Sequence, residues 1–378
     1  MTPFAHPAAA MQYALDLARS GLGRVEPNPP VGAAIVDEQL NLIAEGFHPH
    51  FGGPHAEIVA LTTAGENARG RTLFVTLEPC CHHGKTGPCT AAIIAAGIKK
   101  VVVARIDPAA HAAGQGIARL KQAGIDVEVG LLEHAARKFT APFAKWITLG
   151  LPYVTAKWAM SLDGKIATHA GQSQWISNAR SRARVHELRG RMDGILVGIG
   201  TALADDPLLT ARPAGPRRAT RIIVDALARL PLTSKLATSA KESPVIVACT
   251  SAAPHDRQAA LRAMGVEVLV LPSVVGAAPS ANNVSLLNLL TELGRRGMTN
   301  VLIEGGGRIL GSAFDADLID EYHIFIAPKL IGGQTAPSPL AGRGLAKVPE
   351  YSALDVPEIE QLDGDLYIRA QTKVAVGR

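Results

Sequence analysis

The chain of 378 residues has few aromatic residues, only four cysteines and no long apolar run. Cys80, Cys81 and Cys89 crowd one loop, and Cys249 lies in a strand-like apolar run, so the cysteines exclude the disulfide framework of a small secreted domain and fit a reducing cytosol. The chain lacks both an apolar run long enough to span a bilayer and a basic N-terminal stretch that leads into an apolar one. We therefore expect a cytoplasmic protein with no membrane partner.

Charge is also scarce, at 19% of the residues, and the net charge is only +5. No polybasic tail is present, so the sequence does not call for nucleic acid as a partner, and a phosphorylated small substrate explains the excess of positive charge equally well. Hydrophobic residues make up 47% of the chain, which is typical of a well-buried globular protein. The length exceeds one ordinary core and predicts two domains.

Strands and helices alternate along the first half of the chain. The patterns predict an α/β sandwich in which helices cover a largely parallel sheet. A helix over 132–149 is followed by Gly150-Leu151-Pro152 and a new strand, so we divide the chain into domains at 1–148 and 149–378. The predicted helices cover 8–22, 56–64, 90–96, 116–123 and 132–149, and the predicted strands cover 31–36, 41–46, 71–77, 99–106 and 125–129.

The second half repeats the alternation with different content. A glycine-rich turn at 305–307 follows the strand 300–303 and precedes a helix, which would let backbone amides approach a phosphate. Taken alone, glycines that serve only a tight turn explain this pattern as well. The predicted helices cover 177–192 and 285–296, and 272–283 is a surface loop. The predicted strands cover 153–160, 194–198, 221–224, 245–248, 266–271, 300–303 and 322–327.

The most informative residues are His55, Glu57, Cys80 and Cys89. One imidazole and two thiols can hold a zinc ion and leave its fourth position open for water, whose pKa the metal lowers towards neutrality. Glu57, two residues from His55, can then move protons without binding the metal, as in zinc-dependent deaminases of nucleobase-like rings. Each residue alone is explained as an ordinary surface or buried residue, but the four together, at matching strand, loop and helix positions, favour zinc.

Other residues near this cluster leave their roles open. Cys81 and the pair His82-His83 are alternative ligands, although adjacent residues rarely serve one metal as well as residues on separate elements, and we interpret Cys81 as a non-ligand. Eight residues separate Cys80 from Cys89, where the commonest deaminase pattern has two. Loop positions also make four residues equally suited to the surface or to substrate contact: Asn28, His48, His82 and Lys85.

Long sequence strings in both halves resemble one family. The first half carries PNPPVG at 27–32, PHAE at 54–57, TLEPC at 76–80, HHGKT at 82–86 and PC at 88–89. The second half carries KWAMSLDG at 157–164, SQWI at 173–176, LADDPLLT at 203–210 and EGG at 304–306. In this order they resemble the bifunctional enzymes of riboflavin biosynthesis, which combine a pyrimidine deaminase with a reductase.

The resemblance implies two consecutive reactions. A phosphoribosyl pyrimidine, 2,5-diamino-6-(5-phosphoribosylamino)pyrimidin-4(3H)-one, would lose its ring amino group by hydrolysis, and NADPH would then reduce the ribosyl group to ribityl. It also implies a cytidine-deaminase-like N-terminal α/β/α sandwich with Zn²⁺ and a dihydrofolate-reductase-like α/β domain at the C-terminus. We expect a homo-oligomer, of a size that the sequence does not specify.

Site residues follow from the resemblance position by position. His55, Cys80 and Cys89 would bind zinc, Glu57 would donate and accept protons, and the four loop residues named above would contact the pyrimidine substrate. In the reductase half, NADPH would contact Ala159, Trp175, Thr201, Asp205, Gly306, Gly307, Arg308, Ile309, Leu310, Gly311 and Ser312. The reductase substrate would contact Ser173, Arg189, Leu209, Arg212 and Glu304.

Two differences from the family pattern and two other hypotheses bear on this interpretation. Cys81 stands where the family often has Ser. Ala226 stands where a hydroxyl residue is common, so the resemblance implies that a hydrogen bond to the cofactor is missing there.

One alternative is a nucleoside or tRNA zinc deaminase with a non-catalytic C-terminal binding domain. The strings of the second half argue against it. The other is a zinc-binding module without enzymatic activity, in which Glu57 would be dispensable.

Overall fold

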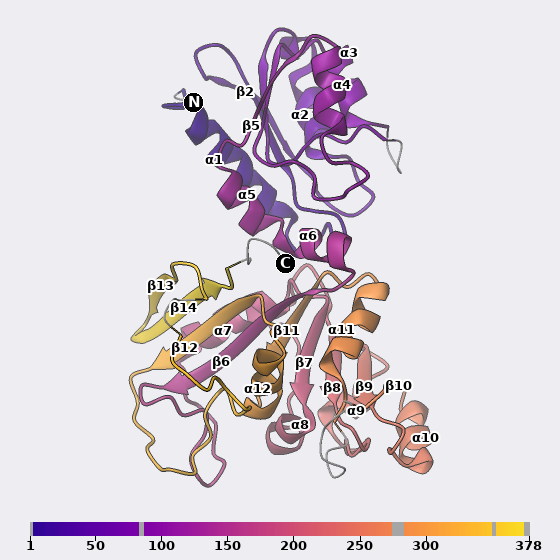
Figure 1. Ribbon diagram of the computed structural model, residues 1–378, viewed down its shortest axis with the longest axis vertical. Coiled ribbons are helices and arrows are strands. Elements are labelled where there is room, and N and C mark those ends of the chain that lie inside the picture. The colour runs from indigo at the N-terminus through magenta and orange to yellow at the C-terminus, as the bar shows by residue number, and fades with distance from the viewer. Residues whose placement is uncertain (1–2, 83–86, 274–282, 350–352, 374–378) are drawn as a thin grey trace. The chain divides into compact units, whose positions relative to one another are not determined.

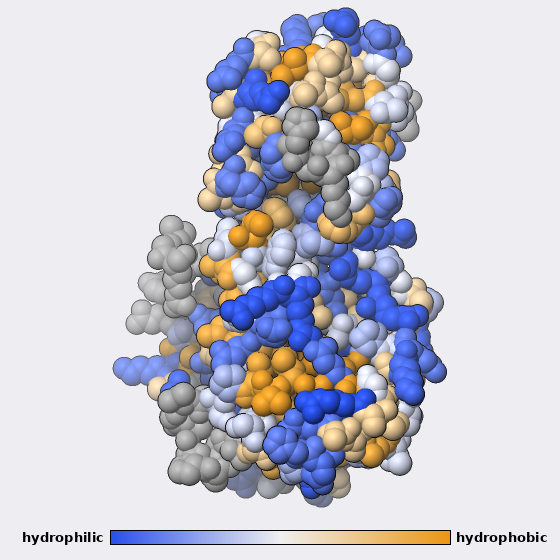
Figure 2. All heavy atoms as spheres, turned by 90° about the vertical axis from the view of Figure 1, so that its right-hand side faces the viewer, coloured by the Kyte–Doolittle hydropathy of each residue, from blue (hydrophilic) through white to orange (hydrophobic). Residues whose placement is uncertain are grey.

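The computed structural model describes residues 3–82, 87–273, 283–349 and 353–373. The chain forms two compact units, Met1–Leu151 (unit 1) and Pro152–Arg378 (unit 2), which divide three residues beyond the predicted boundary. Hydrophilic residues cover much of the visible face of each unit and surround smaller apolar patches (Figure 2). Within the described ranges, no helix combines the length and the apolar character needed to cross a membrane.

Unit 1 contains a five-stranded sheet in the order β2-β1-β3-β4-β5 (Figure 1). Strands β3, β4 and β5 are parallel, whereas β1 is antiparallel to both β2 and β3. The sheet is thus less parallel than predicted, because the short turn between β1 and β2 can join only an antiparallel pair. The strands are β1 Gly32–Val36, β2 Leu42–Phe47, β3 Thr72–Val75, β4 Lys100–Val103 and β5 Asp126–Val129.

Helices cover both faces of this sheet, as the predicted sandwich requires. Met11 of α1 and Ala136 of α5 pack with Phe74 on one face, whereas Ile93 of α3 and Leu120 of α4 belong to the apolar cluster on the other. The helix predicted over 132–149 is two helices that meet at Thr140, because Pro142 fits the first turn of a new helix but not the middle of a long one. The helices are α1 Pro7–Ala18, α2 Ala56–Ala64, α3 Cys89–Ala95, α4 Gln115–Gln122, α5 Glu133–Phe139 and α6 Ala141–Leu149, with 3₁₀ turns at Arg19–Gly21 and Gly65–Ala68.

Unit 2 is built on a nine-stranded sheet in the order β10-β9-β8-β7-β11-β6-β12-β14-β13. All pairs from β10 to β12 are parallel, and β14 is antiparallel to both of its neighbours. The strands are β6 Tyr153–Ser161, β7 Gly194–Gly198, β8 Thr220–Val224, β9 Val245–Cys249, β10 Glu267–Val270, β11 Asn300–Glu304, β12 Glu321–Ala327, β13 Glu358–Leu362 and β14 Asp365–Gln371.

Helices of unit 2 connect the parallel strands and bury their apolar residues. Ala202 of α8, Leu236 of α9 and Leu261 of α10 belong to one apolar cluster with strands β7, β8 and β9. Helices α11 and α12 lie in front of the sheet in Figure 1. The helices are α7 Ala179–Arg189, α8 Ile199–Asp205, α9 Lys235–Thr238, α10 His255–Ala263, α11 Leu286–Arg295 and α12 Gly307–Asp315.

The hairpin of β13 and β14 was absent from the sequence prediction. Its two-residue turn is Asp363-Gly364, where φ is 49° and 97°, so both residues lie in the left-handed region. An Asp-Gly pair between two strand-like segments is a strong hairpin signal, and it was available in the sequence. Helices α8, α9 and α10 are further additions, and α8 and α9 are too short to give a clear helical period.

Candidate active sites

Three potential metal ligands from separate elements meet in unit 1. His55 directly precedes α2, Cys80 lies in the loop after β3, and Cys89 is the first residue of α3. The His55 Nδ1 atom is 3.6 Å from Cys80 Sγ and 3.3 Å from Cys89 Sγ, and the three donor atoms lie within 4.8 Å of one another. The structure thus brings together the three residues that the sequence predicted as ligands.

This donor group fits a zinc ion. Tetrahedral bonds of about 2.0 Å to nitrogen and about 2.3 Å to sulfur place a nitrogen and a sulfur ligand about 3.5 Å apart, close to the two observed separations. Three protein ligands leave one position open, which is the arrangement of catalytic rather than structural zinc sites. Cys81 is not in the donor group, as predicted, and its sulfur instead lies 3.9 Å from Gln115 Oε1.

Local hydrogen bonds favour the thiolate that a metal requires. Contact with the Cys89 thiol and backbone N–H, and with His55, lowers the pKa of Cys80 to about 4. The Cys89 N–H donates to Cys80 Sγ over 3.3 Å, which the position of Cys89 at the start of a helix makes possible. The same contact with Cys80, together with burial, raises the pKa of Cys89, so Cys80 is the thiol of the pair that more readily loses its proton.

Glu57 lies in the first turn of α2 and is only 3% exposed. Burial raises the pKa of its carboxyl group above the ordinary value, although the nearby His55 opposes this change. A raised pKa brings a carboxyl group closer to the pH at which a general acid and base must work. The position of Glu57 beside the donor group is therefore suited to proton transfer.

A cavity of about 360 Å³ opens onto this cluster. Asn28, His48 and His82 line it together with His55 and Glu57, whereas Lys85 lies outside the described residues. His48 Nδ1 lies 2.8 Å from the Pro54 carbonyl oxygen and its Nε2 lies 3.2 Å from Asn28 Nδ2, so His48 donates to the former and accepts from the latter. Burial lowers the pKa of His48, so the neutral imidazole holds the Asn28 amide in place.

Several residues of this site were not predicted from the sequence. The cavity is also lined by Phe51, Asp107, His111 and Trp146, and Asp107 comes from the loop after β4, which is parallel to β3. The loops after neighbouring parallel strands meet at one edge of a sheet, and this rule could have placed Asp107 near Cys80.

Glu78 is a second unpredicted residue, with a structural role. Its buried carboxylate accepts hydrogen bonds from the backbone N–H groups of Asp107 (3.1 Å), Gly114 (2.9 Å) and Ile117 (3.2 Å). These bonds join the loop that carries Cys80 to the loop after β4 and to the start of α4. Glu78 therefore positions the cavity wall.

A buried ion pair marks a second polar site, in unit 2. Arg189, at the end of α7, donates through Nε and Nη2 to the two carboxylate oxygens of Glu304 at 2.6 and 2.7 Å. Its Nη1 donates to the Thr210 carbonyl oxygen over 3.2 Å. Lys157 pairs in register with Glu304 on the adjacent strand, and burial lowers its pKa. Burial opposes ionisation of Glu304, but Arg189 and Lys157 hold the pKa of Glu304 below its ordinary value.

Two of the predicted cofactor residues, Thr201 and Gly306, lie together at the ends of two adjacent strands. Strands β7 and β11 are neighbours, and the chain leaves them in opposite directions towards β8 and β12, which is where parallel α/β sheets bind ligands. Thr201 of α8 faces the glycine turn there, since a Cβ atom at Gly306 would lie 2.8 Å from Thr201 Oγ1. Ser173 Oγ donates to Asp205 Oδ1 over 3.0 Å in the same region.

Burial or existing partners limit how several other predicted residues of unit 2 could contact a ligand. From Gly307 the predicted glycine-rich loop is helix α12, and the side chains of Ile309 and Leu310 are buried. Leu209 is also buried. Three of the predicted residues have other settings: Trp175 is 63% exposed beneath the Arg182 guanidinium, Arg212 is exposed and donates to Thr210 Oγ1, and Ala159 packs beside Phe325.

Comparison with known proteins identifies a known domain in each unit. A family model described as "Cytidine and deoxycytidylate deaminase zinc-binding region" matches residues 6–105, and one described as "RibD C-terminal domain" matches residues 152–368. Together with the donor group, these matches define an enzyme with a zinc-binding deaminase domain followed by a reductase domain. The second match decides against a C-terminal half that only binds.

Full-length relatives then identify the family. The chain is 40% identical to the riboflavin biosynthesis protein RibD of Aquifex aeolicus and 39% identical to that of Actinobacillus pleuropneumoniae, covering 95% of this chain and 96% and 93% of those proteins. The structure of Acinetobacter baumannii RibD matches with a TM-score of 0.82 at 36% identity, over 97% of this chain and 99% of that chain. The chain belongs to the RibD family of riboflavin biosynthesis proteins.

A second solved structure carries both activities in its description. It is the diaminohydroxyphosphoribosylaminopyrimidine deaminase/5-amino-6-(5-phosphoribosylamino)uracil reductase of Thermotoga maritima. It matches with a TM-score of 0.81 at 36% identity and covers 97% of this chain and 98% of that chain. The likeness therefore extends over both units.

Proposed function

We propose that this chain catalyses two consecutive steps of riboflavin biosynthesis on one phosphoribosyl pyrimidine. Unit 1 hydrolyses the ring amino group of 2,5-diamino-6-(5-phosphoribosylamino)pyrimidin-4(3H)-one, and unit 2 reduces the ribosyl group of the product to ribityl with NADPH. The observation that carries the proposal is the convergence of His55, Cys80 and Cys89 beside the buried Glu57 at a cavity. Similarity to RibD proteins along nearly the whole chain supports both steps.

In the deamination, His55, Cys80 and Cys89 hold Zn²⁺, which polarises a water molecule when bound. Glu57 accepts a proton from the attacking water and delivers protons to the ring nitrogen and to the departing amino group. A carbon–oxygen bond forms, the carbon–nitrogen bond breaks and ammonia leaves. Asn28 and His48, fixed by their mutual hydrogen bond, orient the pyrimidine ring, and His82 and Lys85 complete the predicted substrate contacts.

In the reduction, the ends of β7 and β11 hold NADPH, which supplies a hydride to the ribosyl carbon. Thr201 and the backbone at Gly306 would hold the cofactor at the start of α12, where backbone N–H groups suit an anion, and Ala159, Trp175 and Asp205 are the further predicted contacts. The substrate lies beside Ser173 and Glu304, near Leu209 and Arg212. Arg189 keeps the Glu304 carboxylate fixed, because all three of its contacts are to Glu304 and Thr210.

Three sequence-based predictions accompany this function. The chain acts on a small molecule and has no nucleic-acid partner, it forms a homo-oligomer, and it works in the cytoplasm. The free state of all four cysteines agrees with a reducing compartment.

The test is a coupled assay with the purified full-length chain, loaded with zinc and given the diaminopyrimidine substrate. We expect ammonia release first, and NADPH oxidation only after the deaminated intermediate has formed. Supplying that intermediate directly separates the two steps, because it bypasses unit 1. Ammonia release without NADPH oxidation would contradict the reductase assignment, and the absence of both would contradict the proposal.

A further inference from the structure

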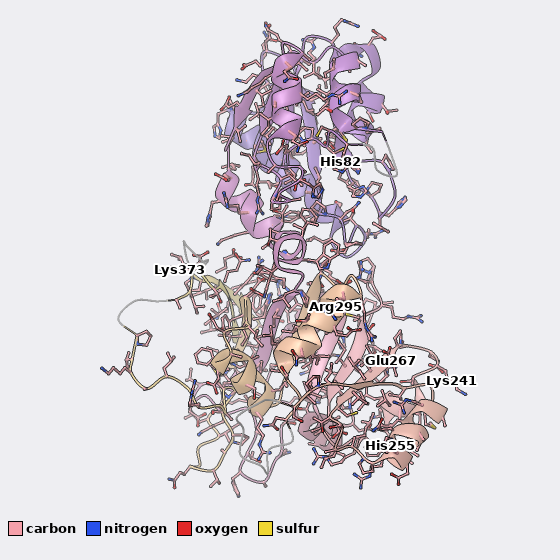
Figure 3. The ribbon with its side chains drawn as sticks, turned by 45° about the vertical axis from the view of Figure 1, so that its right-hand side comes forward. His82, Lys241, His255, Glu267, Arg295 and Lys373 are labelled. Carbon is pink, nitrogen blue, oxygen red and sulfur yellow. The ribbon has the colours of Figure 1, made fainter. Side chains whose placement is uncertain are left out.

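Two exposed imidazoles lie among the lining residues of the unit 1 cavity. His82 comes from the loop after β3 and is labelled in Figure 3, and His111 comes from the loop after β4. Their ring centres are 5.9 Å apart in an edge-on arrangement. The proposed mechanism does not use His111, and neither the sequence strings nor the family resemblance assigned it a role.

The direction in which the substrate must enter places its phosphate near these rings. The amino-bearing end of the pyrimidine has to reach His55, Cys80 and the buried Glu57 for deamination to occur. The ribosyl phosphate is attached elsewhere on the ring and therefore extends from this buried end towards the exposed lining residues. This step rests on the proposed function.

Exposed lining residues offer few groups that can bind an anion. Phe51, Phe143, Trp146 and Ile147 present mainly apolar surface, and no lysine or arginine lines the cavity among the described residues. His48 and Asn28, joined by their mutual hydrogen bond, are the residues proposed to orient the pyrimidine ring, and His55 faces the two thiols. The imidazoles of His82 and His111 remain as N–H donors, and an imidazole keeps one donor even when it is neutral.

Nearby carboxylates do not block this position. Glu78 uses its oxygens for three backbone N–H groups. Asp107 Oδ1 accepts from the Ala109 N–H over 2.8 Å, and the Asp107 carboxylate interacts favourably with both imidazoles when these are charged. Both carboxylates therefore have backbone hydrogen-bond partners of their own beside the two rings.

We propose that His111 is a specificity-determining residue of the deaminase site and that, with His82, it binds the 5′-phosphate of the substrate between two imidazoles. Two rings at this spacing can each donate to a different oxygen of one phosphate group. The ligand class is a phosphate monoester on a ribosylamino pyrimidine, and the pair distinguishes the phosphorylated substrate from the corresponding riboside. Charge-assisted hydrogen bonds of this kind are the stronger class in proteins.

The experiment compares His111→Ala with the wild type in the full-length, zinc-loaded protein. Ammonia release is measured with the phosphorylated diaminopyrimidine and with its dephosphorylated riboside. We expect KM for the phosphorylated substrate to rise about tenfold or more, with kcat changed less than about twofold and the riboside unaffected. His111→Gln retains an N–H donor and should restore part of the loss. His134→Ala, an exposed histidine on α5 outside the cavity lining, is the matched control.

Three further measurements test whether the variant is folded and whether the pair binds phosphate. Zinc content and NADPH oxidation from the pre-formed intermediate should equal those of the wild type, which shows that the variant is folded. Inorganic phosphate should inhibit the wild type more strongly than His111→Ala. An unchanged KM, or equal losses with both substrates, would overturn this inference and leave the proposed function intact. Failure of the wild type to release ammonia from either compound would instead contradict the proposed function.

Discussion

The proposed deamination depends on Glu57. This buried carboxyl group transfers protons and is not one of the three metal ligands. We expect Glu57→Gln to lower the rate of ammonia release by about 10²–10⁴-fold, because the amide cannot accept and return a proton. Zinc content should stay at that of the wild type, since the three ligands are unchanged. NADPH oxidation from the deaminated intermediate is the internal control. A variant that retains full deamination would contradict the assignment of Glu57 as the group that transfers protons.

The proposed role of Arg189 depends on the shape of its side chain and not only on its charge. Its planar guanidinium contacts both oxygens of Glu304, and a lysine ammonium at the same place cannot reproduce this paired contact. We expect Arg189→Lys to lower kcat/KM for the reduction at least about tenfold while deamination is unchanged. Arg191→Lys, at an exposed position just beyond the helix, is the matched control. Equal activities of the two variants would show that the paired contact is not needed.

Close packing between elements positions the zinc ligands. Gly116 in α4 approaches the loop that carries Cys80 so closely that a Cβ atom there would lie 2.0 Å from the Pro79 carbonyl oxygen. We expect Gly116→Ala to lower the stability of unit 1 by about 1–3 kcal/mol and to weaken zinc binding, because α4 and the loop must separate. Lys121→Ala, at an exposed position on the same helix, should change stability by less than about 0.5 kcal/mol. Denaturant unfolding and zinc titration measure the two effects.

The pairing of β12 with β14 buries a network of charged and polar groups. Glu321 contacts Arg369 and lies 3.2 Å from His323 Nε2, and His323 Nδ1 lies 2.6 Å from the Tyr367 hydroxyl. Burial alone would raise the pKa of Glu321, but the contacts with His323 and Arg369 lower it to about 2, from an ordinary value of 4.5. The ionised carboxylate therefore stabilises this part of the sheet.

A pH dependence of stability follows from this shift. Because the folded pKa is the lower one, the stabilisation is complete above pH 4.5 and is lost as the pH falls from 4.5 towards about 2. The loss is on the order of 3 kcal/mol. Glu321→Gln should be less stable than the wild type at neutral pH, and the difference should shrink over this acidic range. Calorimetry across the range measures it, and Glu358→Gln, with its exposed carboxylate on β13, is the control.

On the scale of the whole molecule, the two activities belong to separate compact units and should be separable. Removing zinc with a chelator should abolish ammonia release, because the ligands lie only in unit 1 among the described residues. NADPH oxidation from the pre-formed intermediate should remain within about twofold, since no step proposed for the reduction uses the metal. Adding zinc back should restore the first activity. Parallel loss of both activities would show that the metal also supports unit 2.

Local signals explain most of what could be predicted about the fold. The helix α2 and the strands β1, β3 and β4 lie within the predicted segments, because each has a clear apolar pattern and nearby glycine or proline. The hairpin of β13 and β14 was missed although Asp363-Gly364 marks its turn. The break at Thr140 was also missed, because a helical period continues across Pro142.

The sequence by itself determined the donor types at the metal site and the family, because long motifs preserve residue identity and order. Only the tertiary structure decided which distant residues share a site. His111 and Asp107 line the cavity of Cys80 because β3 and β4 are parallel neighbours, and Arg189 meets Glu304 because α7 packs near the end of β11. Contacts between residues more than a hundred positions apart, such as this ion pair, depend on the pairing of strands and helices, and no local pattern records that pairing.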